Sequence, residues 1–339
     1  MPWGTIVASY RQHRDNHRHD TLAEYLSDFV AYIEGATTMF PDDQQGASFV
    51  EIAAQLWFRT YVAPWKEELG AQRPRDGDDP YELLRRRIAE DQSGWERNPP
   101  LERVESHFPD AVIADYDDAL KEMERGLFET DKLPADIRRS LCKSLRLFLS
   151  RRSGLVDGCS GLVIAGMGEA EHFPGLLHCY VGPIVKGRLR LDAFDSAQIT
   201  ARNSASVIPF AQRETIDGII AGIRPELRDD LPGFVFDSLD EAARKGAQDG
   251  VLKRFRGRLR QAIYERYASP LVDAVDAMPR LELAAMAEVL VNLTVFRAHA
   301  SVGQPETVAG PIDVALLSKG EGFVWVKRKE ARAAARISP

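Results

Sequence analysis

Apolar residues recur every three or four positions along the first half of the chain, a spacing that predicts helices with one apolar face. Residues 21–35 are the first clear example, and Asp20 and Thr21 before them are typical of a helix N-cap. An aromatic-rich helix is expected at residues 49–65, with Pro64 at its end. Several more helices, separated by prolines, are expected between residues 81 and 152. The pattern therefore predicts a mainly helical, charged region.

The pattern changes near residue 160, where short apolar runs bounded by glycines replace the helical spacing. Residues 161–168, 177–181 and 187–191 are expected to form strands of a meander. The glycines at positions 166 and 168 suggest a phosphate loop. The third glycine of that motif is absent, however, and the acidic residues that follow would repel a phosphate. No nucleotide site is expected.

The last part of the chain combines helices with a hairpin. A small polar cluster at residues 203–206 is expected to cap a helix at residues 207–223, and a long charged helix is expected at residues 240–268. Leu283, Met286, Ala287, Leu290 and Leu293 place one apolar stripe along a helix that ends near His299. Two β-rich runs within residues 312–327, joined by a glycine-containing turn, predict a hairpin. A helix packed across a sheet is the expected arrangement.

Composition and charge narrow the class of protein. The 339 residues are 44% apolar and 28% charged, as in a soluble globular protein. A net charge of −7 and a pI near 5.6 argue against a nucleic-acid partner, because nucleic-acid binders usually carry a basic excess. No apolar run approaches the roughly 20 residues of a membrane span, and the N-terminus does not begin a signal peptide. A cytoplasmic protein without a membrane partner is expected.

The residue types that bind metals or attack substrates form no convincing set. Cys142, Cys159 and Cys179 have neither zinc-site spacing nor the even number of a disulfide framework, and are expected to be reduced, buried side chains. His13 and His17 are four residues apart, a metal-ligand spacing. They lie, however, in a charged stretch without apolar periodicity, so a solvated connector is the preferred interpretation. No metal and no cofactor are expected.

From residue 160 onward the order is three strands, a small polar turn, three helices and two strands. In this order residues 160–213 and 282–328, under half of the chain, resemble the second half of a proteasome-like N-terminal-nucleophile (Ntn) hydrolase in its divergent bacterial form. The resemblance implies an α+β fold with antiparallel sheets covered by helices, incomplete at its N-terminus, and a large helical insertion at about residues 35–152. The implied division is a helical region at 1–152, an α/β portion at 153–330 and a tail at 331–339.

The resemblance also implies a chemistry. In that family an N-terminal threonine, serine or cysteine is the nucleophile, and its own α-amino group, with a pKa of about 8, is the base. An aspartate and a lysine from the first strands tune this site, and a glycine amide stabilises the oxyanion. This sequence has no such first strands, and it opens directly on a helix-like or strand-like segment at residues 3–10. Thr5 and Ser9 are the nearest candidates, but no strand hairpin follows them.

The family's supporting turn matches residues 306–310, with the acid changed to Glu306, the hydroxyl lost at Ala309 and Gly310 retained. The serine of the family's small polar turn is matched by Ser204 or Ser206. Helix capping and turn formation explain the same residues without catalysis. The weak candidate catalytic residues are therefore Thr5, Ser204, Ser206, Glu306 and Gly310.

Three functions remain open. The first is a peptide or amide hydrolase whose true N-terminus and nucleophile lie upstream of Met1. The second is a catalytically inactive relative that acts as a scaffold, in a homo-oligomeric ring with like subunits. The third, which ignores the resemblance, is a non-enzymatic helical module with a small α/β cap that binds protein partners through residues 21–152.

Overall fold

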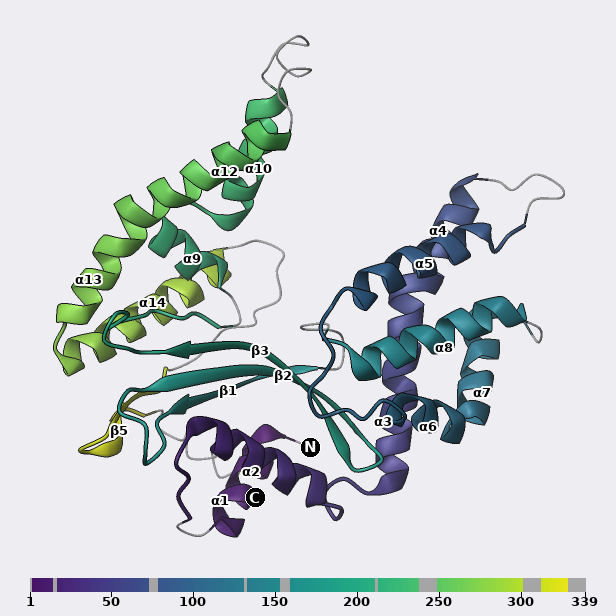
Figure 1. Ribbon diagram of the computed structural model, residues 1–339, viewed down its shortest axis with the longest axis horizontal. Coiled ribbons are helices and arrows are strands. Elements are labelled where there is room, and N and C mark those ends of the chain that lie inside the picture. Colours follow the sequence, from purple (N-terminus) through teal and green to yellow (C-terminus); the bar gives the residue numbers. More distant parts are fainter. Residues whose placement is uncertain are drawn as a thin grey trace, which may run out of the picture. The chain divides into compact units, whose positions relative to one another are not determined.

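The computed structural model describes residues 2–14, 17–72, 79–130, 133–152, 159–210, 213–237, 249–300 and 312–328. The chain mixes helices with small antiparallel sheets, as expected for the α+β class. It divides into two compact units, Met1–Gln198 (unit 1) and Ile199–Pro339 (unit 2). Figure 1 labels the helices and strands of each unit.

Unit 1 contains a helical part followed by a three-stranded meander. Its elements are α1 (Trp3–His13), α2 (Leu22–Gly35), α3 (Asp42–Trp57), the π-helical turn η1 (Phe58–Val62), α4 (Ala63–Gln72), α5 (Glu82–Glu96), α6 (Phe108–Asp115), α7 (Asp117–Phe128), α8 (Ala135–Ser150), β1 (Ser160–Gly166), β2 (Gly175–Val185) and β3 (Arg188–Gln198). The helical region and the meander expected from the sequence are both confirmed. The strands pair antiparallel in the order β1-β2-β3.

The expected cap of α2 is present. The Thr21 hydroxyl accepts a hydrogen bond from the Glu24 amide (3.3 Å), and the Glu24 carboxylate accepts one from the Thr21 amide (3.2 Å). This reciprocal capping box satisfies amide donors that a helix leaves unpaired at its N-terminus. It fixes where α2 begins and so which face of the helix is buried.

Two apolar cores hold unit 1 together. In one, Val181, Ile184 and Leu189 of the sheet pack against α1 and α2, which lie along this face of the sheet (Figure 1). In the other, buried side chains of the helices from α3 to α8 pack together, with Trp57 of α3 among them. Val185 of β2 belongs to the same cluster. Val185 precedes the two-residue turn Lys186–Gly187, whose φ angles of 50° and 69° suit a tight hairpin. The sheet thus shares cores with residues before 152, where the sequence placed a boundary.

The helix predicted at residues 49–65 does not end at Pro64, so the predicted end was wrong. The helix starting at Asp42 continues through η1 into α4, and Pro64 lies in the first turn of α4. A proline lacks the amide donor and clashes with the carbonyl four residues earlier, here that of Thr60. Thr60 lies within the wider π turn, which displaces that carbonyl and lets the helix continue.

Unit 2 contains five α-helices and a hairpin among its described residues. They are α9 (Glu214–Ala221), α10 (Pro225–Asp237), α12 (Asp249–Ile263) with the π-helical turn η2 (Tyr264–Ala268), α13 (Ser269–Ala277), α14 (Arg280–Ala300), β4 (Val314–Ser318) and β5 (Gly322–Lys327). The last helix and the hairpin are confirmed, and α14 contacts β4.

The helix predicted at residues 207–223 was wrong in its first half. Residues 204–210 have no regular secondary structure, and α9 begins only at Glu214. Pro209 explains the difference, because it removes an amide donor and disfavours helical geometry at Ile208. The polar cluster at 203–206 therefore does not cap a helix. It belongs to an extended segment.

The strands of the described residues form two sheets, the three-stranded β1-β2-β3 and the two-stranded β4-β5. The layered Ntn arrangement that the resemblance implies stays a prediction. None of the described helices is both long enough and apolar enough to cross a membrane.

Candidate functional site

Thr5 lies in the first turn of α1. Its side chain is exposed, and its backbone nitrogen donates a hydrogen bond to the Pro2 carbonyl (3.1 Å). In this position the nitrogen is a peptide amide, so it has no lone pair to act as the base of an N-terminal nucleophile. Ser9, on the same helix, accepts a hydrogen bond from the Tyr32 hydroxyl (2.6 Å). The Ser9 hydroxyl thus has a structural contact, and the Thr5 nitrogen is part of the helix.

Ser204 and Ser206, by contrast, lie in the wall of a cavity in unit 2, whereas Glu306 and Gly310 fall outside the described residues. The cavity has a volume of about 690 Å³ and lies between the extended segment after β3 and three helices, α9, α13 and α14. Its lining residues are Ile199, Ser204, Ala205, Ser206, Val207, Ile208, Pro209, Phe210, Ile216, Val275, Asp276, Leu283, Met286, Ala287, Leu290 and Val291.

The apolar stripe expected on the last helix accounts for one wall of this cavity. Leu283, Met286, Ala287 and Leu290 all line it, whereas Leu293 does not and is exposed. These positions share one helix face because they are three and four residues apart. The sequence had assigned the stripe to packing across a sheet. In unit 2 a large part of it faces a cavity instead.

The polar groups of the cavity are two hydroxyls and one carboxylate. Asp276, near the end of α13, is the only charged lining residue, and neither it nor the two serines has a hydrogen bond or ion pair within the described part of the chain. Among the described lining residues, Asp276 is therefore the one side chain that titrates near physiological pH or below it.

Unit 1 contains a buried pair of opposite charges that the sequence did not single out. Arg190 on β3 is 3% exposed, and its guanidinium donates to the carbonyls of Phe148 (2.8 Å) and Arg151 (3.1 Å) at the end of α8. Burial lowers the pKa of Arg190, and the nearby Cys159 and Asp192 oppose that shift. Asp192 is fully buried, and its carboxylate lies 4.0 Å from the Arg152 side chain. A cation at a helix C-terminus is favourable. Arg190 thus fastens the sheet to the end of α8.

A signal for this pair was present in the sequence. Leu189 and Leu191 alternate with Arg190 and Asp192, so the two charges share one face of a strand whose other face is apolar. Alternation of this kind usually indicates a solvated face. Here the second face is buried against the end of α8, which the spacing of residues within one strand does not reveal.

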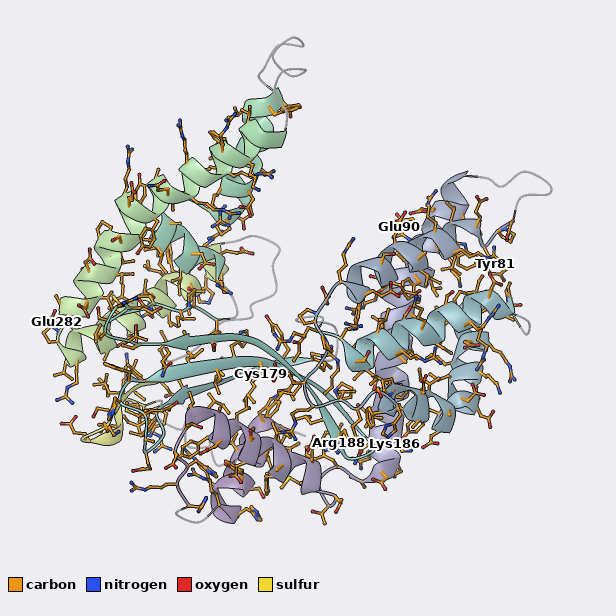
Figure 2. The ribbon with its side chains drawn as sticks, in the orientation of Figure 1. Tyr81, Glu90, Cys179, Lys186, Arg188 and Glu282 are labelled. Carbon is orange, nitrogen blue, oxygen red and sulfur yellow. The ribbon has the colours of Figure 1, made fainter. Side chains whose placement is uncertain are left out.

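Two of the three cysteines are not poised for catalysis. Cys179 lies on the central strand β2 (Figure 2), where burial and the charge of Asp192 raise the pKa of its thiol to about 11. Burial also raises the pKa of the Cys142 thiol. Because the thiolate is the reactive form, both thiols are weak nucleophiles near neutral pH. All three cysteines are free thiols in the structure.

The stretch interpreted as a solvated connector is more ordered than the sequence predicted. Helix α1 extends to His13, whose ring packs against Tyr32 (5.0 Å between centroids), and the His19 side chain is only 16% exposed. His19 lies 3.4 Å from the Asp28 carboxylate, which also accepts a hydrogen bond from Tyr10 (2.5 Å). No group of three possible metal ligands occurs among the described residues.

The acidic loop after β1 has a structural role at the start of α2. The Glu171 carboxylate accepts hydrogen bonds from the amides of Gly168 (2.7 Å) and Leu22 (3.1 Å). Leu22 is the first residue of α2, so the carboxylate occupies the position that a bound anion takes at a helix N-terminus. The chain thus supplies its own anion where the glycines had suggested a phosphate.

The chain matches no family model, no curated protein and no solved structure. Its function has to be inferred from the residues themselves. Two features stand out in the described part of the chain, the cavity of unit 2 and the apolar surface of the same unit.

Proposed function

We propose that this chain is a proteasome-like, Ntn-hydrolase-related protein that acts as a binding subunit rather than as a hydrolase, and that it associates with a second copy of itself through unit 2. The relationship is supported by the order of elements: a three-stranded meander, then helices, then a long helix that leads into a hairpin. The binding role is supported by where the exposed apolar side chains lie.

Exposed apolar side chains are concentrated on unit 2, and this observation carries the proposal. Among described residues, four of the exposed large apolar side chains lie in unit 1: Val7, Phe58, Val163 and Phe173. All the others lie in unit 2. The buried apolar residues described there are few and include two alanines: Ala205, Ile216, Val275, Ala284 and Val314. Large exposed apolar surfaces usually mark interaction sites.

Strand β5 carries four consecutive side chains of this exposed apolar set. Phe323, Val324, Trp325 and Val326 are all exposed, at 43–53%, although successive residues of a strand point to opposite faces. A continuous apolar run of this kind is typical of strands that are covered on both faces. In the described residues β5 pairs only with β4, so its other edge has free amide and carbonyl groups. An isolated two-stranded hairpin is marginally stable, and an added strand would stabilise it.

A second copy of β5 fits that edge. In an antiparallel pair related by a two-fold axis at Val324, Phe323 of each copy lies opposite Trp325 of the other. Glu321 of each copy then lies opposite Lys327 of the other, which places opposite charges at both ends of the pair. Glu321 is exposed and also pairs with Arg280 (2.7 Å) within the chain. The apolar middle and the charged ends together favour self-pairing in this register.

The other functions have less support. In residues 21–152, Phe58 is the one described exposed large apolar side chain. Charged side chains on those helices pair with one another, as Lys66 does with Glu129 (2.7 Å) and Lys143 with Glu96 (2.6 Å). That surface offers a partner little apolar area. The hydrolase function would need a nucleophile and base that the described site candidates do not provide.

The oligomeric state of the full chain tests the proposal. Light scattering or mass photometry at micromolar concentration is expected to find a dimer. Replacing Trp325 or Val324 with lysine places a charge in the middle of the paired strands, and we expect the dissociation constant to rise about 10-fold or more for each. Phe58→Lys is the matched control, because Phe58 is 47% exposed and Trp325 46%. The control variant should dimerise as the unmodified chain does.

Two results would contradict the proposal. One is a chain that stays monomeric up to about 100 μM, well above the micromolar affinities of most specific complexes. The other is hydrolysis of peptide or amide substrates that disappears in Thr5→Ala, because that result would assign catalysis to a residue that the proposal treats as structural.

A further inference from the structure

The cavity of unit 2 lies where a core is expected. Ala205, Ile216 and Val275, three of the five apolar residues that are buried in the described part of this unit, line it. The cavity is open to solvent, since Ser204, Ser206 and Asp276 of its lining are exposed. Its volume of about 690 Å³ falls within the range of small-molecule sites, about 300–1,000 Å³.

The walls of the cavity suit an apolar molecule. Val207, Ile208 and Phe210 contribute from the extended segment, and Leu283, Met286 and Leu290 contribute from α14. Apolar side chains provide no hydrogen-bond donors or acceptors along most of this wall, so water bound there would form few hydrogen bonds. Met286 adds a flexible, polarisable side chain that can adapt to the shape of a ligand.

The polar lining has one sign of charge. Asp276 contributes a carboxylate without an ion-pair partner in the described chain, and the lining residues include no cation. Ser204 and Ser206 add hydroxyls that can donate or accept hydrogen bonds. A ligand with a positively charged head group would gain attraction from Asp276, whereas an anionic head group would be repelled.

We infer that this cavity binds a small amphipathic molecule, with an apolar chain along α14 and a cationic head group at Asp276. The inference goes beyond the proposed function and does not rest on it, because none of the lining residues belongs to β5. The inferred site also gives Ser204 and Ser206 a binding role.

Binding of matched ten-carbon probes to the full chain tests this site. Decylamine, decanol and decanoate share an apolar chain and differ in the charge of the head group. By isothermal titration at pH 7, below micellar concentrations, decylamine is expected to bind with one site per chain and roughly 10-fold more tightly than decanoate. Decanol is expected to lie between them.

Two variants locate the site. Asp276→Asn should remove the preference for decylamine over decanol, while Asp273→Asn should not, because this exposed carboxylate on the same helix does not line the cavity. Leu290→Trp should fill the cavity and abolish binding of all three probes. Val289→Trp is its control, because Val289 is 55% exposed and does not line the cavity.

Circular dichroism establishes that each variant is folded, and Ala287→Phe replaces Leu290→Trp if the latter does not fold. Equal affinity for decylamine and decanoate, no saturable binding, or unchanged binding in a folded cavity-filling variant would overturn the inference. Light scattering of the same samples measures self-association separately. Loss of probe binding can therefore be distinguished from loss of dimerisation.

Discussion

The guanidinium of Arg190 binds two carbonyls at the end of α8, and its ring neighbour is Phe148, 4.5 Å from the guanidinium carbon to the ring centroid. Two groups therefore depend on one side chain: the helix end and the aromatic ring. A charge that is removed from water is stable only when such partners compensate it. At the residue scale, this is the polar contact that reinforces the apolar packing between the helical part of unit 1 and its sheet.

Replacing Arg190 with methionine should therefore be costly. The substitution keeps the length and the apolar contact with Phe148, but it leaves two carbonyls without their donor and removes one of the cations near the buried Asp192, whose carboxylate also lies 4.0 Å from Arg152. We expect the free energy of unfolding to fall by about 3 kcal/mol. Urea unfolding at pH 7 measures this loss.

Arg188 provides the control, two residues earlier on the same strand and at the end of the β2–β3 hairpin (Figure 2). Its side chain is 50% exposed and pairs loosely with Glu34 (3.9 Å) and Glu105 (3.7 Å). Exposed pairs of this kind contribute little, so Arg188→Met should cost less than about 1 kcal/mol. Equal losses for the two variants would show that the buried contacts of Arg190 are not what stabilises the junction.

At the scale of elements, the loop after β1 fixes the start of α2. The amides of Glu169 and Ala170 donate to the carbonyls of His19 and Asp20 (3.0 and 3.1 Å), and Glu171 caps Leu22. Such close contact between two backbones requires a residue without a side chain. A Cβ atom at Gly168 would lie 2.1 Å from the Asp20 carbonyl oxygen and 2.5 Å from the Thr21 nitrogen.

Gly168→Ala is accordingly predicted to separate the loop from α2. Because both clashing atoms belong to the backbone, no side-chain rotation relieves them, and we expect a loss of about 2–4 kcal/mol in thermal or urea unfolding. Gly94→Ala in α5 is the control, since its Cβ would meet nothing within 4 Å. That change should be neutral or stabilising by up to about 1 kcal/mol. A Gly168→Ala protein as stable as the control would refute the role of the close approach.

Elements were predicted best where one local pattern decides them. The capped apolar face of α2 and the hairpin β4–β5 follow from spacing and turn residues alone. Two helix ends that were predicted next to a proline were wrong. One is at Pro64, and the other is before Pro270, where the helix predicted to end at residue 268 continues through η2 into α13. Each proline lies two residues after a π-helical turn, and that widening depends on packing along the whole helix.

The candidate site could be predicted only in part, because a local pattern does not show which segments pack together. The stripe on α14 is periodic and was visible in the sequence. Asp276 and the serines meet it only because α13 and the extended segment converge on the same side of α14. Convergence of segments about 70 residues apart is a property of the fold, and periodicity within one helix carries no information about it.

At the scale of the whole molecule, the two units differ in how much apolar surface they bury. Unit 1 has two clusters of buried residues, and its largest fully buried side chains include Trp57, Tyr61 and Phe49. In the part of unit 2 that the structure describes, few apolar residues are buried, and three of them line a cavity. Burial of apolar surface is the main favourable term in folding, so the stability of the chain should be distributed unequally.

Fragments of the chain allow the stability of the two units to be measured separately. Residues 1–198 retain both clusters and are expected to unfold cooperatively by circular dichroism, whereas residues 199–339 alone are expected to give no cooperative transition. Residues 1–152 are the informative control. They end where the sequence placed its boundary and lack Val181, Ile184 and Leu189, so the apolar faces of α1 and α2 lose the sheet that covers them. A stable 1–152 fragment would mean that the helices need no sheet, and a cooperative 199–339 fragment would mean that unit 2 needs neither partner nor ligand.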